Sequence, residues 1–160
     1  MIYWFFGYPG IGKDYCAKEL SKIGKFPHLD ADDFLTATDK KKLLNKTFTK
    51  EDRVKKLTRI VKHIEKLQKK FDSIAIADSL PDNTSRKFVL KSFKEVKLIH
   101  VVAPEKLHRE RISKRSNHFF TERLLNDYIS KNWQEVKVDH VVFKNVETKD
   151  WSKRLKKLLE

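Results

Sequence analysis

The sequence contains the run Gly7-Tyr8-Pro9-Gly10-Ile11-Gly12-Lys13-Asp14, which begins where an apolar run at residues 2–6 ends. Three of the four glycines of the chain lie in this run, so a local cause must concentrate them here. Glycine lets the backbone turn its N–H groups inward around phosphate oxygens, and a helix starting at Lys13 adds the positive end of its dipole. The spacing G-x-x-x-x-G-K between a buried strand and a helix therefore predicts a phosphate-binding loop.

Strand-like and helical patterns alternate along the rest of the chain. The predicted strands are residues 2–6, 27–29, 73–77, 96–102 and 140–146, and the predicted helices are residues 13–23, 51–71, 84–93, 104–114, 121–133 and 149–159. This alternation is typical of βαβ units, so we predict an α/β fold with three layers, α/β/α, and a mainly parallel five-stranded sheet. Ligands of such sheets bind at the carboxyl ends of the strands, and each motif described below follows a strand.

The composition is typical of one intracellular domain, which we expect to cover residues 1–160. Cys16 is the only cysteine, so no disulfide can form within the chain. No apolar run approaches the ~18 residues of a membrane-spanning helix, and residues 1–6 are too short for a signal peptide. We therefore expect a cytoplasmic monomer or homodimer without a membrane partner. The net charge of +14 favours acidic ligands, but nucleic acid is a less favoured partner because the lysines are spread along the chain.

The phosphate-binding loop predicts a site for ATP and Mg²⁺. Lys13 would reach the β- and γ-phosphates and stabilise the charge that develops during transfer. Asp14 stands where such loops usually have Ser or Thr, and its carboxylate could hold Mg²⁺ directly or through water. The predicted ATP-binding residues are Gly7, Tyr8, Pro9, Gly10, Ile11, Gly12, Lys13, Asp14, Tyr15, Arg111 and Asn145.

Acidic residues follow the second and third predicted strands. Asp30, Asp32 and Asp33 have no cation beside them in the sequence, so a functional role explains them better than a surface turn. We predict that Asp30 and Asp32 are catalytic and contact the acceptor: one orients or deprotonates its hydroxyl, and the other holds Mg²⁺ through water. Capping of a helix by Asp32 or Asp33 is the structural alternative. Asp78 ends the third strand and is predicted to face the Mg²⁺ ion.

Four arginines are candidates for binding anionic groups. Arg53 could clamp an anionic acceptor, and Arg86, one turn into a predicted helix, could contact it as well. Arg111 and Arg115 are four residues apart and project from one helix face. On a short helical lid at residues 109–133 they would close over ATP, stabilise transition-state charge and exclude water. The alternative for this pair is two solvated arginines on a basic helix.

Several of these motifs resemble those of small P-loop kinases. Asp30-Ala31-Asp32 is similar to the Asp-Gly-Asp of gluconate kinases and adenylylsulfate kinases, and residues 48–53, Phe-Thr-Lys-Glu-Asp-Arg, are similar to a segment found in both families. Residues 111–119 resemble the gluconate kinase pattern Arg-(Leu/Ile)-x-x-Arg-x-x-His-Phe, in which His118 could bind an acceptor carboxylate or phosphate. The Gly-Lys-Asp ending of the loop resembles that of phosphomevalonate kinases and of some viral deoxynucleoside monophosphate kinases.

The resemblance covers most of the chain and is strongest to the gluconate kinase family. It implies a P-loop kinase fold and ATP- and Mg²⁺-dependent transfer of a phosphoryl group to a hydroxyl of a small anionic metabolite such as a sugar acid. A nucleoside monophosphate kinase is an alternative, favoured by Asp14 and by Asp78-Ser79-Leu80-Pro81, which resembles the Asp-Gly-Phe-Pro of adenylate kinases. A polynucleotide 5′-hydroxyl kinase is another, favoured by the charge and by Trp133 and neighbouring aromatic residues that could stack bases. A non-catalytic nucleotide- or nucleic-acid-binding module is the third.

Overall fold

The computed structural model describes residues 1–114 and 122–160. Its strands are β1 (Ile2–Phe6), β2 (His28–Asp30), β3 (Ile74–Asp78), β4 (Val96–Val102) and β5 (Val141–Lys144). Its α-helices are α1 (Lys13–Gly24), α2 (Ala37–Leu44), α3 (Lys50–Leu67), α4 (Asn83–Ser92), α5 (Glu105–Ser113), α6 (Glu122–Asn132) and α7 (Trp151–Lys156), and its 3₁₀ helices are η1 (Ala31–Phe34) and η2 (Lys157–Leu159). The five predicted strands are confirmed, whereas the helix predicted to reach residue 71 ends at Leu67.

The segment between β2 and α3 is helical, although the sequence pattern predicts no helix there. A capping box starts α2: the Thr36 hydroxyl accepts the N–H of Asp39, and the Asp39 carboxylate accepts the N–H of Thr36. Arg59 of α3 donates to Asp39 and to the carbonyl of Phe34, which fastens the segment to α3. The helix escaped prediction because its sequence, Ala-Thr-Asp-Lys-Lys-Lys-Leu-Leu, has no apolar face of helical period.

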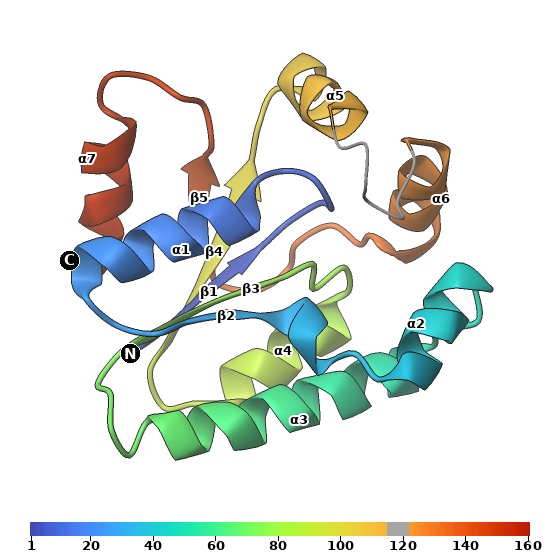
Figure 1. The fold of residues 1–160 in the computed structure, drawn as a ribbon, viewed down its shortest axis with the longest axis horizontal. Helices are drawn as coiled ribbons and strands as arrows, with labels where there is room; N and C mark the ends of the chain where they lie inside the picture. Colours follow the sequence, from blue (N-terminus) through green and yellow to red (C-terminus); the bar gives the residue numbers. More distant parts are fainter. Residues whose placement is uncertain (115–121) are drawn as a thin grey trace.

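The sheet is parallel throughout and has the strand order β2-β3-β1-β4-β5 (Figure 1). The central strand β1 pairs with β3 on one side and β4 on the other, so that Phe6 lies between Asp78 and His100. The chain leaves β1 for β2 and β3 on one side of it, and then crosses from β3 past β1 to β4 on the other side. The loop that follows β1 therefore lies at the point where the strand order reverses, which is where ligands bind in open α/β sheets.

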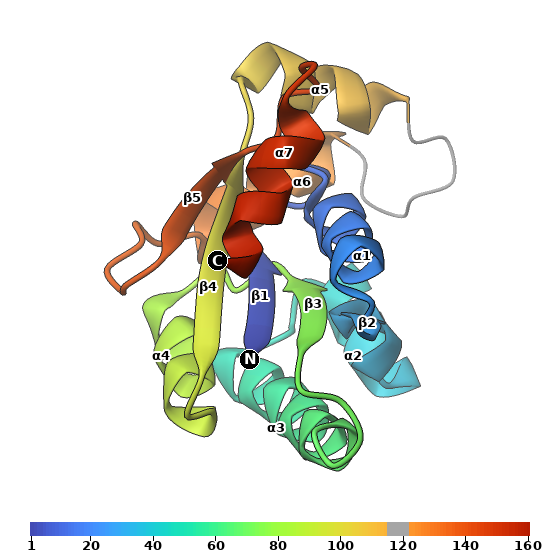
Figure 2. The same ribbon diagram turned by 90° about the vertical axis from the view of Figure 1, so that its left-hand side faces the viewer.

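Helices cover both faces of the sheet, as the three-layer prediction requires (Figures 1 and 2). In β1, Tyr3 and Phe5 pack into the core beneath α1 and α7, whereas Trp4 and Phe6 pack into the core that α3 and α4 close. Both faces of this strand are buried, which explains why the run is apolar at every position. The α/β/α prediction is confirmed.

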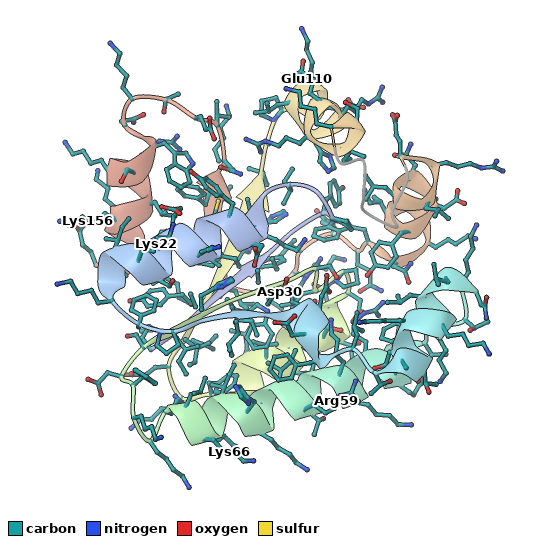
Figure 3. The ribbon with its side chains drawn as sticks, in the orientation of Figure 1. Lys22, Asp30, Arg59, Lys66, Glu110 and Lys156 are labelled. Atoms are coloured by element: carbon teal, nitrogen blue, oxygen red, sulfur yellow. The ribbon has the colours of Figure 1, made fainter. Side chains whose placement is uncertain are left out.

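Three helices lie beyond the carboxyl ends of the strands. Figure 1 shows α2, α5 and α6 beyond the carboxyl ends of the strands, where the phosphate-binding loop also lies. Basic side chains are distributed over the surface: in Figure 3, Lys66 and Lys156 point away from the body on different sides, and Asp30 lies centrally at the end of β2. No helix among residues 1–114 and 122–160 has the length and apolar character needed to cross a bilayer.

Candidate active site

The phosphate-binding loop has a backbone conformation that favours glycine. Gly7, Gly10 and Gly12 all have positive φ angles, of 152°, 78° and 91°. A Cβ atom on Gly7 would come within 2.6 Å of the carbonyl oxygen of Val101, and one on Gly12 would collide with the side chain of Asn145. Helix α1 begins at the next residue, Lys13, so the N–H groups of its first turn open toward the loop.

Asn145 fastens this loop to the C-terminal part of the fold. Its Nδ2 donates to the carbonyl of Ile11 over 3.0 Å, and its Oδ1 accepts the indole N–H of Trp151 over 2.9 Å. The residue is only 2% exposed. The predicted contact of Asn145 with ATP is therefore not supported for its side chain, because both polar atoms of the amide are used inside the protein.

Arg111 lies against the same loop. It donates one N–H to the carbonyl of Ile11 and another to the carbonyl of Asn145, each over 3.0 Å. His108, one turn earlier on α5, has Nε2 2.8 Å from the carbonyl of Pro9, so this nitrogen is the donor. Helix α5 is thus docked onto the outside of the loop, and the predicted position of Arg111 beside the phosphate site is consistent with this arrangement.

Asn145→Ala is expected to destabilise the protein by about 1–3 kcal/mol, because it leaves the indole N–H of Trp151 buried without an acceptor. The nucleotide affinity should fall only as far as the loop loosens. Urea unfolding measures the first effect and calorimetric titration with ATP the second, with Asn45→Ala, on the exposed end of α2, as the control. A large loss of ATP affinity at unchanged stability would instead support a direct contact between the Asn145 side chain and ATP.

A cleft of about 340 Å³ lies in front of the loop and collects most of the predicted site residues. The predicted site residues that do not line it are Gly7, Tyr8, Ile11, Arg86, Arg111 and Asn145. Two others, Arg115 and His118, lie outside the described residues, so the roles of these two and the predicted lid stay predictions. The predicted residues that line it are Pro9, Gly10, Gly12, Lys13, Asp14, Tyr15, Asp30, Asp32, Arg53 and Asp78.

Asp14 is linked to β2. Its Oδ1 lies 2.9 Å from Nε2 of His28, and the carboxylate is half-exposed toward the cleft. The hydrogen bond from His28 lowers the pKa of Asp14, burial opposes this, and the charges of His28 and Lys13 lower it further. A lowered folded-state pKa means that the carboxylate stays ionised down to below pH 3.8, so the group is anionic wherever ATP chemistry would take place.

Asp30 has the opposite electrostatic environment. Burial raises the pKa of its carboxyl, the N–H of Asp32 that it accepts over 2.9 Å lowers it, and the charges of Asp32, Asp14 and Asp33 raise it again. The hydrogen bond makes Asp30 the cap of η1, a role that the sequence assigns to Asp32 or Asp33. A half-buried carboxylate with a raised pKa accepts a proton more readily than an ordinary one.

Lys56 is a cleft residue that the sequence analysis missed. Its Nζ lies 2.8 Å from Oδ1 of Asp78, and both side chains are buried. Burial lowers the pKa of Lys56, but the charge and hydrogen bond of Asp78, together with the charges of Asp32 and Tyr128, raise it, and the pKa is raised overall. The sequence pattern could have indicated this residue, because a lysine on the apolar face of a helix needs a buried partner. Lys56 lies on that face of α3, beside Leu57 and one turn before Ile60.

Asp78 retains one unused oxygen. Oδ1 accepts both from Lys56 and from the backbone N–H of Ser79, each over 2.8 Å. Oδ2 is buried and makes no hydrogen bond to any part of the chain that the structure describes. Because an unpaired buried oxygen is costly, this atom is suited to a ligand or to an ordered water at the floor of the cleft.

The two predicted acceptor arginines are held in different ways. Arg53 forms a buried ion pair with Asp82 over 2.7 Å and still lines the cleft. Arg86 is 0% exposed, donates to the carbonyls of Leu80 and Pro81, and lies with its guanidinium 4.7 Å from the ring of Trp133. Burial lowers the pKa of Arg86 to about 10. The predicted contact between Arg86 and the acceptor is therefore wrong for this structure, because the guanidinium is enclosed and its donors are occupied.

A family profile described as an AAA domain matches residues 2–132. The chain belongs to this AAA domain family. No curated protein sequence matches the chain. Solved structures show the same fold: a sugar kinase from Janibacter sp. HTCC2649 has a TM-score of 0.81 at 20% identity, covering 99% of this chain and 91% of that one.

Two further solved structures are similar to this chain. A gluconokinase from Sinorhizobium meliloti 1021 has a TM-score of 0.75 at 17% identity, with 97% of this chain and 86% of that one covered. The Mycobacterium tuberculosis APS kinase in complex with AMPPNP and APS has a TM-score of 0.65 at 17% identity, with 99% and 94% covered. At these identities the likeness shows a kinase-like P-loop fold and leaves the substrate open.

The AAA domain has acidic groups at the loop that suit Mg²⁺. Among residues 1–114 and 122–160, no three His, Cys, Asp or Glu side chains are grouped as a metal site. Mg²⁺ is usually held by one or two carboxylates together with phosphates and waters, so a complete protein cage is not expected. Asp14 and Asp78 both line the cleft, and Oδ2 of Asp78 has no hydrogen-bond partner among the described residues.

Proposed function

We propose that the AAA domain is an ATP- and Mg²⁺-dependent phosphotransferase that moves the γ-phosphoryl group to a hydroxyl of a small anionic metabolite. One observation carries the proposal: Lys13 of the phosphate-binding loop and the strand-end carboxylates Asp30 and Asp78 line the same cleft. A cation for the transferred phosphate, an oxygen for the metal and a base for the acceptor are thereby within one cavity.

In this proposal the loop and the start of α1 hold the phosphates through backbone N–H groups. Lys13, whose Nζ lies 3.3 Å from the carbonyl of Tyr8, neutralises charge on the transferred group, and Arg111 keeps the loop in place from outside. Asp14 and Asp78 would hold Mg²⁺, which neutralises charge on the β- and γ-phosphates when bound. Arg53 supplies positive charge on the acceptor side of the cleft.

Asp30 is the proposed general base. The acceptor oxygen forms a bond to the γ-phosphorus, the bond from that phosphorus to the β-γ bridging oxygen breaks, and the hydroxyl proton passes to the Asp30 carboxylate. ADP leaves with the bridging oxygen. The raised pKa of Asp30 suits the role, and Asp32 at the same cleft is the alternative proton acceptor.

Asp30→Asn is expected to lower kcat by roughly 100- to 10,000-fold while the Kd for ATP stays unchanged. Asparagine keeps an oxygen that can cap η1, so the fold should survive. Steady-state ADP release and ATP titration measure the two quantities. Asp33→Asn, at the exposed neighbouring carboxylate, is the matched control, and its kcat should be close to that of the wild type. Equal losses of kcat in both variants would contradict the role of Asp30 as general base.

The structural neighbours support a small acceptor. They include proteins named gluconokinase and sugar kinase, and an APS kinase whose structure holds AMPPNP together with APS. The narrower hypothesis of a sugar acid rests on the sequence resemblance to gluconate kinases.

A screen for acceptor-stimulated ADP release tests the proposed function. The panel contains gluconate, other sugar acids, nucleoside monophosphates and 5′-hydroxyl oligonucleotides, each with ATP and Mg²⁺. Stimulation by any small anionic acceptor supports the proposal. If ATP binds and no acceptor stimulates release, the non-catalytic alternative is favoured.

A further inference from the structure

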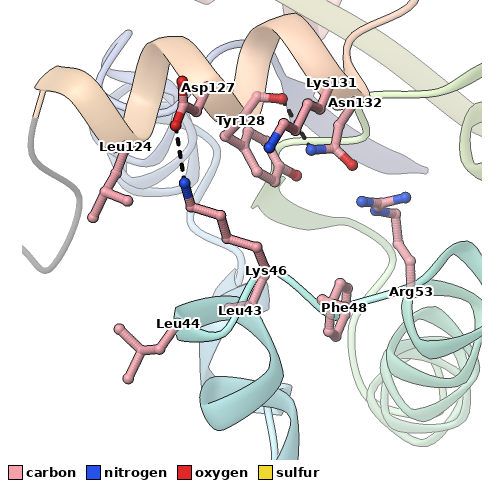
Figure 4. A pocket seen from close by; sticks show the side chains of 10 residues that line it. All are labelled: Leu43, Leu44, Lys46, Phe48, Arg53, Leu124, Asp127, Tyr128, Lys131 and Asn132. Atoms are coloured by element: carbon pink, nitrogen blue, oxygen red, sulfur yellow. Dashed lines mark hydrogen bonds and ion pairs between the residues drawn. The ribbon is translucent and has the colours of Figure 1, made fainter.

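A second cavity opens beside the cleft, between α2, residues 45–53 and α6 (Figure 4). We call it the α2–α6 pocket; it has a volume of about 270 Å³. Leu43, Phe48, Arg53 and Tyr128 line both cavities, so the two lie next to each other. A molecule that places a hydroxyl in the cleft would reach this pocket on the side of these four residues.

The walls of the α2–α6 pocket are largely apolar. Leu43, Leu44, Phe48 and Leu124 line it, and Leu44 is 59% exposed. The Phe48 ring is half-buried, and the guanidinium carbon of Arg53 lies over it, 5.7 Å from the ring centre. This contact helps to fix the position of the ring. Exposed apolar walls in a concave site are stabilised when an apolar surface covers them.

Most polar groups of the pocket already have partners. Arg53 is paired with Asp82, Asn132 donates to the carbonyl of Tyr128 over 3.0 Å, and Lys46 is paired with Asp127 over 3.0 Å. An open-chain polyol would place several hydroxyls against Leu and Phe carbons, where each loses its hydrogen bonds to water. An apolar ring has no such hydrogen bonds to lose, and a flat ring can lay its apolar face on these carbons with its polar edge toward solvent.

Lys46 is held in a backbone conformation that does not suit it. Its φ is +58°, the left-handed region, at the position after α2 where glycine is usual. The N–H of Thr47 bonds the carbonyl of Lys42 over 2.8 Å and closes this helix end. This turn places Lys46 among the residues that line the pocket.

That side chain extends across the mouth of the pocket to Asp127 on α6 (Figure 4). The pair is exposed on both sides, 49% and 42%, so it is weak and an incoming anion can replace Asp127 at little cost. Lys131, one turn further along α6, adds a second positive charge at the same rim.

We infer that the acceptor is an anion that carries an apolar or aromatic ring, with the ring in the α2–α6 pocket and the anionic group at Lys46 and Lys131. The inference rests on the proposed function, since it names the acceptor class of that phosphotransferase. It separates this acceptor from a sugar acid, which has the charge and the hydroxyls without the ring.

Binding of two matched probes tests the ring. Uridine 3′-monophosphate combines a base ring, a free primary hydroxyl and a phosphate, and methyl β-D-ribofuranoside 3-phosphate has the same sugar, hydroxyl and phosphate with a methoxy group in place of the base. With AMPPNP and Mg²⁺ saturating the nucleotide site, we expect uridine 3′-monophosphate to bind at least tenfold more tightly in calorimetry. Phe48→Ala should reduce this preference at least fivefold, whereas Phe71→Ala, an exposed phenylalanine beyond the end of α3, should leave it unchanged. Equal binding of the two probes would overturn the inference.

Lys46→Gly tests the anion. Glycine suits the left-handed backbone, so the melting temperature should stay the same or rise, while the Kd for uridine 3′-monophosphate should increase at least fivefold. Unchanged affinity would overturn the placement of the anionic group. Because these are binding measurements, they test the inference independently of the rate of ADP release. If gluconate stimulates ADP release and the two probes bind equally well, the proposed function is supported and the inference is contradicted.

Discussion

Lys13→Ala is expected to lower kcat/KM for phosphoryl transfer by roughly 100- to 1000-fold, the usual loss when a group that stabilises transition-state charge is removed. Lys13 starts α1 directly after Gly12 and lines the cleft. Its ammonium would lie against the transferred phosphate, where charge develops during the reaction. Initial rates with ATP, Mg²⁺ and the acceptor found in the screen measure the loss.

The control for this variant is Lys18→Ala on the exposed face of the same helix. It removes the same charge from α1, so it corrects for any general effect of net charge on nucleotide affinity. The melting temperatures of both variants should stay close to that of the wild type. If Lys13→Ala leaves ATP binding and turnover intact, the assignment of the loop as the catalytic phosphate site is wrong.

Asp78→Asn is expected to destabilise the protein by about 3–5 kcal/mol and to abolish activity. The substitution leaves the buried ammonium of Lys56 without its counter-charge, which is the costly way to break a buried ion pair. It also removes the carboxylate that we propose for Mg²⁺. Urea unfolding gives the first effect and ADP release the second.

A double variant separates these two roles. Asp78→Asn combined with Lys56→Met removes both buried charges, so much of the lost stability should return. Activity should stay lost, even at raised Mg²⁺, because the metal-binding carboxylate is still missing. Recovery of activity together with stability would mean that Asp78 serves only as the partner of Lys56.

Much of the fold was predictable because its determinants are local. Glycines at three positions of positive φ and a lysine at the following helix start are visible in the sequence without any contact information. The alternation of buried strands and helices gave the layers and the parallel sheet. The short α2 was missed since its start depends on a capping box and on Arg59, twenty residues from Asp39 in the chain.

The candidate site was predictable only in part. Asp30 and Asp78 end β2 and β3, Arg53 lies in the first turn of α3, and all three line the cleft. Arg86 and Asn145 have equally suitable positions in the sequence, but both are buried with their polar atoms occupied. Residue type and spacing cannot separate these two cases, because burial depends on which distant segments pack around each side chain.

The sequence by itself determined the phosphate-binding loop and the three-layer parallel fold, since backbone conformation and hydrophobic period are properties of short segments. The tertiary structure decided which side chains and cavities lie beside this loop. It paired Lys56 with Asp78 across 22 residues, tied Asn145 to Ile11 across 134, and set α2 opposite α6 to form an apolar pocket beside the cleft. These contacts follow from the strand order β2-β3-β1-β4-β5, which brings segments together irrespective of their distance along the chain.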